Sequence, residues 1–177
     1  MRWDALFADM ELQLVAADSD ARAQEVADIT RAERAAVLLA DRLRAAEGTT
    51  VGITLASGHR LEGTVLDAAA AWVLLARGGG EHLISLTAVA AVSGLGPGSA
   101  GPTGLALRRL GLGHALRAVA RDRSLVRVTT FGATVQGRID AVGADHVDVG
   151  LAFEDDGRPT GERQAVTFAR LEVVSTL

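Results

Sequence analysis

The chain has 177 residues, of which 49% are hydrophobic, 23% charged and 3% aromatic, and none is cysteine. This length fits one domain of ordinary size or two small ones. Without cysteine the chain has no disulfide framework, thiolate nucleophile or cysteine-ligated zinc, so we expect a cytoplasmic protein. The longest apolar run, residues 68–76, is about half of what a membrane span needs, and Asp4 and Asp9 stand where a signal peptide carries positive charge. We therefore expect neither membrane insertion nor export.

The net charge of −4 is distributed unevenly along the chain. Residues 1–47 carry six arginines against ten acidic residues, and residues 128–177 carry four against eight, so each segment has a net charge of −4. Residues 99–127 carry six arginines against one acidic residue, a net charge of +5. Partners respond to local fields, and the positive charge of this chain is concentrated in this one short stretch.

Residues 1–47 have the apolar spacing of amphipathic helices. The apolar positions are Trp3, Leu6, Phe7, Met10 and Leu14, and then, after Asp18-Ser19-Asp20, Val26, Ile29, Val37, Ala40 and Leu43. The pattern predicts either one interrupted helix or a helical hairpin. Arg42 and Arg44 suit the negative end of a helix dipole, and Gly48 suits a C-terminal cap. The helical segment is therefore predicted to end near residue 47.

Strands are predicted on both sides of a linker. In residues 48–96 the period changes to two, and turn signals recur between the apolar positions. Glycine and proline are too dense in residues 94–104 for a helix or strand, so residues 97–124 are predicted to form a linker and then a basic helix capped by Thr103. Alternation returns in residues 125–177.

The two strand-rich segments contain an internal repeat. Gly58 and Gly63 match Gly132 and Gly137 at one constant offset along the chain. The apolar positions around them correspond as well: Val65 with Ile139, Val73 with Val147, Leu75 with Val149, and, after an insertion, Ile84, Leu86, Val89 and Val92 with Val166, Phe168, Leu171 and Val174. We predict an α+β fold in which N-terminal amphipathic helices precede two tandem five-stranded small β-barrels, joined by the linker and the basic helix.

The order of helix, strand, Gly-x4-Gly hairpin, long third strand and short final pair resembles the Sm/LSm fold, an SH3-like small barrel. The first copy is spaced much like the bacterial Sm-like RNA chaperone Hfq. The resemblance implies RNA binding, but the residues at the family's RNA site differ here. The Sm aspartate position holds Ala69 or Gly143, the asparagine position holds Val73 or Val147, and the basic pair is replaced by Leu86-Thr87 or Phe168-Ala169. The usual RNA site is therefore not expected.

A basic stretch offers another possible nucleic-acid contact. Its residues are Arg108, Arg109, Arg117, Arg121, Arg123 and Arg127. Helical spacing places His114, Arg117 and Arg121 on one stripe, which could follow phosphates without reading bases. Alternatively, these arginines are solvated or face the acidic N-terminal helices.

No motif predicts catalysis, a cofactor, a metal or a small-molecule substrate. The four histidines, His59, His82, His114 and His146, lack the helical spacing of a metal site. His146 and Asp148 share a strand face, but no serine lies near them in sequence to suggest a triad. The Gly-rich segments match turns rather than phosphate-binding loops. We therefore expect no enzyme.

The outward faces of the two predicted barrels differ in polarity. The first copy presents Leu66, Trp72, Leu74 and Leu83, whereas the equivalent positions of the second hold Asp140, His146, Asp148 and Ala165. Leaving such large apolar side chains in water would forgo about 1.5–3 kcal/mol each. The N-terminal helices, the second barrel or another subunit are expected to cover them, and an uncovered patch would mark a partner site.

Two functions follow from these patterns. The first is a non-catalytic, homo-oligomeric scaffold or adaptor that binds protein partners through its helices and barrel surfaces. Short strands leave edges that Sm-like barrels commonly pair between subunits, which is the reason to expect oligomers. The alternative is an Sm-like RNA- or DNA-binding regulator that uses residues 108–127.

Overall fold

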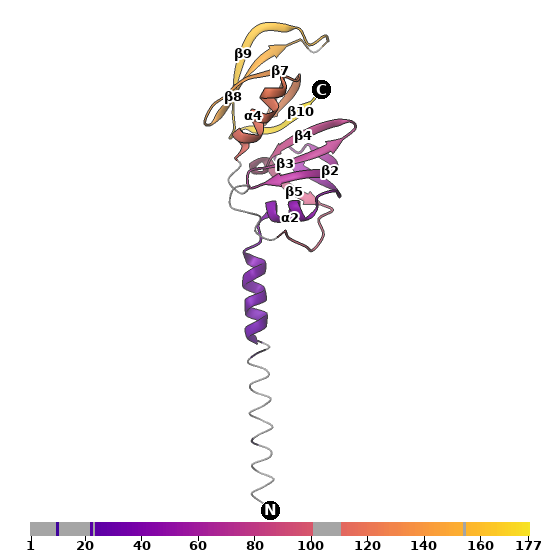
Figure 1. Ribbon diagram of the computed structural model, residues 1–177, viewed down its shortest axis with the longest axis vertical. Helices are drawn as coiled ribbons and strands as arrows, with labels where there is room; N and C mark the ends of the chain where they lie inside the picture. The colour runs from indigo at the N-terminus through magenta and orange to yellow at the C-terminus, as the bar shows by residue number, and fades with distance from the viewer. Residues whose placement is uncertain (1–9, 11–21, 23, 101–110, 154) are drawn as a thin grey trace, which may run out of the picture. The chain divides into compact units, whose positions relative to one another are not determined.

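The structure is a computed structural model that describes residues 10, 22, 24–100, 111–153 and 155–177. It divides into two units, Met1–Val37 and Leu38–Leu177. In the first unit, residues 24–35 form a helix (Figure 1), and almost all of these residues are exposed. The helix expected before residue 18 lies outside the described residues, except for Met10. No helix in the described ranges is both long and apolar enough to cross a membrane.

The second unit contains helices and strands in two successive groups. The first group is α2 (Leu39–Ala45), β1 (Thr50–Leu55), β2 (Arg60–Ala69), β3 (Trp72–Arg77), β4 (Gly80–Ser85), the short 3-10 helix η1 (Leu86–Ala88) and β5 (Val89–Ser93). The second group is α4 (Leu112–Asp122), β6 (Val126–Thr130), β7 (Ala133–Val142), β8 (His146–Ala152), β9 (Pro159–Thr167) and β10 (Leu171–Thr176). Thr103, the predicted cap of the basic helix, lies outside the described residues, and α4 begins at Leu112.

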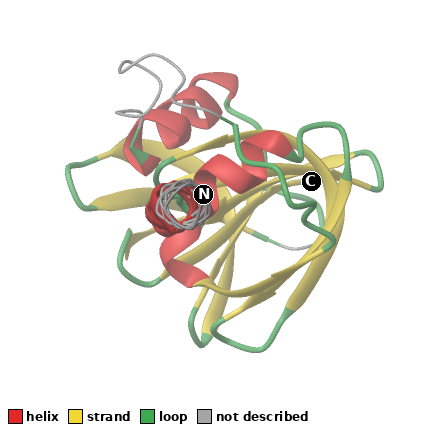
Figure 2. Ribbon diagram, turned by 90° about the horizontal axis from the view of Figure 1, so that it is seen from below, coloured by secondary structure: helices red, strands yellow, loops and turns green. Residues whose placement is uncertain are grey.

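All ten of these strands belong to one antiparallel sheet, in the order β5-β1-β2-β3-β4-β10-β6-β7-β8-β9. Figure 1 shows β10 beside β4, and Figure 2 shows the strands from below. The predicted α+β fold with two closed five-stranded Sm-like barrels is therefore wrong: the protein is mostly β, and the sheet is open. The two groups join where β4 pairs with β10, with Ile84 opposite Val173 and Leu83 opposite Val174. Alternation in the sequence determines which face of a strand is buried, but not which strand lies beside it.

The two groups share several structural details. Within the sheet, the first group has the order β5-β1-β2-β3-β4 and the second has β10-β6-β7-β8-β9. The register of β2 on β3 shifts at Leu66, and the register of β7 on β8 shifts at Asp140, which is the equivalent position of the repeat. Such a β-bulge bends the strand and increases its twist. The long strands β2 and β7 therefore bend at equivalent positions.

The paired glycines have different physical roles. Gly58 and Gly132 lie in turns with φ of +86° and +118°, a region that side chains rarely adopt. Gly63 and Gly137 instead lie where a strand passes close to its neighbour. A Cβ at Gly63 would lie 2.6 Å from the carbonyl oxygen of Ala76, and one at Gly137 would lie 2.1 Å from that of Gly150. Each Gly-x4-Gly hairpin thus combines a left-handed turn with a close backbone approach.

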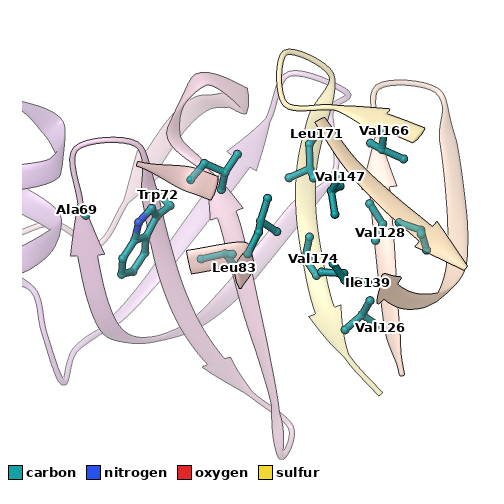
Figure 3. Close-up of a cluster of buried hydrophobic side chains, with 13 residues drawn as sticks. Ala69, Trp72, Leu83, Val126, Val128, Ile139, Val147, Val166, Leu171 and Val174 are labelled. Carbon is teal, nitrogen blue, oxygen red and sulfur yellow. The ribbon is translucent and has the colours of Figure 1, made fainter. Parts of the chain in front are cut away.

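Two apolar clusters form the core of Leu38–Leu177. One is centred on Val65, Val73 and Ile84 and receives Leu43 from α2. The other contains residues of both strand groups and receives Leu112 and Leu116 from α4. Figure 3 shows Trp72 and Leu83 of the first group in this second cluster, together with Val174 of β10. The two strand groups therefore share a core as well as a sheet.

A buried carboxylate also connects the two groups. Glu172, at the register shift of β10, is only 2% exposed. One of its carboxylate oxygens accepts the backbone N–H of Ser57 at 3.0 Å, and the other accepts the Ser57 hydroxyl at 2.6 Å. The carboxylate thus holds the β1–β2 turn against the start of the last strand.

Replacing Glu172 with alanine is expected to lower the free energy of unfolding by about 1.5–3 kcal/mol, because two partly buried donors of Ser57 lose a charged acceptor. Ser57→Ala removes only the hydroxyl donor and is expected to cost about 1 kcal/mol. Urea unfolding of both variants measures the difference. A Glu172→Ala variant as stable as the wild type would show that this contact contributes nothing.

Candidate interaction surfaces

The apolar face predicted on the first strand group is largely covered within the chain. Trp72 is 7% exposed and Leu83 is 4% exposed, and Leu74 packs against the same cluster. Their neighbours include α4 and strands of the second group. Leu66 is 37% exposed because it is the extra residue of the β2 bulge, where it has no opposite residue on β3. Only part of the predicted surface therefore remains accessible.

The cover is incomplete, because a groove of about 440 Å³ lies between α4 and the strands beneath it. Trp72, Leu74 and Leu83 line one side, and α4 residues line the other. The groove-lining residues of α4 are His114, Ala115, Ala118, Val119 and Asp122, and the lining is completed by Asp67, Glu81, Ser124 and Thr176. The groove thus combines apolar walls with three carboxylates and contains no arginine. Its acidic residues lie on three different elements, so no local sequence pattern relates them.

The described part of the basic stretch forms no such pocket. Arg117, Arg121, Arg123 and Arg127 are all exposed. Arg117 donates through Nη2 to the carbonyl of Gly143 at 3.5 Å, and none of the four forms an ion pair with a carboxylate in the described ranges. Arg108 and Arg109 lie outside the described residues.

Three of the positions that correspond to the Sm base pocket are buried. Val73 and Val147, at the asparagine position, are each 0% exposed and belong to the two core clusters. Ala69, at the aspartate position, is also buried. These three side chains are therefore not accessible to a base.

Two histidines have shifted pKa values, in opposite directions. Burial, and secondarily the positive charge of Arg77, lowers the pKa of His82, whose Nδ1 lies 2.8 Å from the Ser175 hydroxyl at the β4–β10 junction. The hydrogen bond between His146 Nδ1 and Asp145, at 2.8 Å, raises the pKa of His146. No three His, Asp or Glu residues in the described ranges are placed to hold a metal ion.

These shifts predict opposite pH effects on stability. The folded-state pKa of His82 lies below 6.5, so its contribution is complete above that pH and is lost as the pH falls through the lowered value. The folded-state pKa of His146 lies above 6.5, so its contribution is complete below that pH and is lost as the pH rises through the raised value. Between pH 7.5 and 5.0, the melting temperature of His82→Gln should fall less than that of the wild type, and that of His146→Gln should fall more. Parallel curves for the three proteins would contradict this.

The described strands leave an unpaired edge at each end of the sheet. Among the described strands, β5 pairs only with β1, and β9 pairs only with β8. Most residues of β9 are exposed, as are Ala90, Ala91 and Ser93 of β5. Unpaired edges offer rows of backbone donors and acceptors to another strand. The period-two pattern predicted that strands were present but could not identify the strands at the ends of the sheet.

No protein-family model matches the chain, and no curated protein matches it.

Proposed function

We propose that the protein is a non-catalytic scaffold or adaptor that self-associates through its sheet edges and holds protein partners. The observation that carries this proposal is the β4–β10 junction together with the β5 and β9 edges, which no further described strand pairs with. In strand order, β9 corresponds to β4 and β5 corresponds to β10. We also propose that the two strand groups are tandem copies of an Sm-like five-strand unit. On this basis, β9 of one molecule pairs with β5 of the next molecule.

The correspondence gives the register of this contact. At the internal junction, Ile84 lies opposite Val173, Leu83 opposite Val174 and His82 opposite Ser175. In these strands the repeat aligns Ile84 with Val166 and Val92 with Val174. The contact between two molecules would therefore place Val166 of one molecule opposite Ala91 of the other, Ala165 opposite Val92 and Gln164 opposite Ser93.

Light scattering tests the self-association. The expected mass is a multiple of 18.3 kDa, and a monomer at high concentration would overturn the proposal.

The register itself is tested at Gln164. Next to its proposed partner, Ser93, lies Arg60, whose Nη2 donates to the Ser93 hydroxyl at 3.3 Å. Gln164→Glu should strengthen the association at low salt and Gln164→Arg should weaken it, each by about two- to fivefold. Both substitutions are at an exposed position, so the fold should be retained. Equal dissociation constants for the two variants would exclude this register.

Nucleic-acid binding is the second candidate, favoured by four exposed arginines without ion pairs among the described residues. Such binding would be weak and without base preference, with a log-log salt slope near −2 for two to three phosphate contacts. Arg117→Ala combined with Arg121→Ala should flatten that slope by about one to two units. The scaffold proposal expects no measurable binding of a mixed RNA pool at physiological salt. The ratio of absorbance at 260 and 280 nm of freshly purified protein gives a first test.

A further inference from the structure

The groove beside α4 has a polarity that restricts what it can bind. Its volume of about 440 Å³ falls in the usual range for ligand sites. Trp72, Leu74 and Leu83 from the strands face Ala118 and Val119 of the helix across it. Leu74, Ala118 and Val119 are only partly buried or exposed, so they favour a ligand whose apolar side chains cover them and leave water at the same time.

Negative charge gathers at the end of the groove near the C-terminus of α4. Asp122 is the last residue of α4, and the helix dipole is negative at that end. Glu81 lies at the same end of the groove. Its backbone N–H donates to the Thr176 hydroxyl at 2.9 Å, and Thr176 pairs with Val126, which follows shortly after the end of α4. A cation on the ligand is therefore favoured here.

The arginines near this end, including Arg121 and Arg123 on either side of Asp122, do not line the groove. The positive charge of Arg77 lies close to His82. Successive side chains of a strand point to opposite faces, so His82 lies on the other face of β4 from the groove residue Leu83. Arg127 lies opposite Ser175, and Ser175 and the groove residue Thr176 point to opposite faces of β10. Arg117 donates to Gly143, which is not a groove residue. Apart from His114, the ionisable side chains that line the groove are therefore carboxylates.

We infer that this groove binds a short extended peptide of a partner protein, in which two apolar side chains are followed by a lysine or arginine. From His114 to Asp122 the helix rises about 12 Å, close to the length of four extended residues. In an extended peptide, side chains at alternate positions point the same way, so two apolar residues can meet the walls while the cation reaches Glu81 and Asp122. The inference rests on the proposed scaffold function, since it names the kind of partner that the scaffold holds.

Fluorescence anisotropy with a labelled, end-blocked peptide Leu-Ser-Leu-Ser-Arg tests the inference on the full chain. Two peptides serve as controls: Leu-Ser-Leu-Ser-Glu reverses the charge, and Ser-Ser-Ser-Ser-Arg removes the apolar side chains. Only the first peptide is expected to bind, and salt should weaken its binding. Equal binding of the arginine and glutamate peptides, or no binding of the first peptide, would overturn the inference.

Variants locate the binding site. Glu81→Gln combined with Asp122→Asn should weaken binding about three- to tenfold. Glu47→Gln combined with Asp155→Asn removes the same charge at exposed positions outside the groove, β5 and β9, and should leave binding unchanged. Ala118→Trp, at an exposed helix position, should block the groove. Wild-type affinity in both groove variants, with unchanged melting temperatures, would overturn the inference.

Light scattering on the same samples separates this inference from the proposed self-association. The groove variants do not alter β5 or β9, so the oligomeric mass should stay constant. An oligomer that fails to bind the peptide would overturn the groove inference and leave the self-association standing. A monomer that binds it would overturn the self-association and leave the groove standing.

Discussion

Trp72→Ala is expected to lower the free energy of unfolding by about 3–5 kcal/mol, the usual cost of removing a large buried aromatic side chain. Trp72 is only 7% exposed, and its cluster includes Leu83, Leu116 and Val174. The substitution leaves a cavity where β3 and α4 meet, so it weakens the packing of both strand groups. Urea unfolding monitored by circular dichroism measures the change.

The matched control for Trp72 is His146, which occupies the equivalent position in the second strand group. Its side chain is 40% exposed and contacts Asp145, so His146→Ala removes no core packing. The melting temperature of this variant should stay close to that of the wild type, whereas that of Trp72→Ala should fall sharply. Similar losses for the two variants would show that the two outer faces do not differ in packing.

Gly137→Ala is expected to destabilise the protein by about 3 kcal/mol or more, the upper part of the range for overpacking. The new Cβ would lie 2.1 Å from the carbonyl oxygen of Gly150 and 2.9 Å from its carbonyl carbon. Both contacts are with backbone, so β7 and β8 would have to separate. The equivalent change at Gly63 should be milder, because its closest contact is 2.6 Å. Thermal unfolding of the two variants gives the order.

Gly98→Ala provides the control for a change from glycine to alanine. A Cβ at Gly98 would meet nothing within 4 Å, and its φ is outside the left-handed region. This variant should be as stable as the wild type or slightly more stable, because alanine restricts the unfolded chain. If Gly98→Ala and Gly137→Ala lose equal stability, the close approach of β7 to β8 is not the cause.

The sequence by itself predicted the local features of this protein. Alternating apolar residues predicted strands, because one face of each strand must be buried, and the alternation correctly grouped Val65, Val73 and Ile84 in one core. The glycine pairs marked the hairpins, because a left-handed turn and a close backbone approach both exclude side chains. These properties depend on neighbours along the chain or on a single strand.

Only the tertiary structure decided which strands lie side by side. The last strand of the chain, β10, lies between β4 and β6 in the middle of the sheet, so the ten strands form one open sheet rather than two closed barrels. The Glu172–Ser57 contact and the groove between α4 and the first strand group depend on that placement. Backbone hydrogen bonds are alike for every strand, so an edge carries no sequence signal for its partner, and residues distant along the chain meet only after the sheet is assembled.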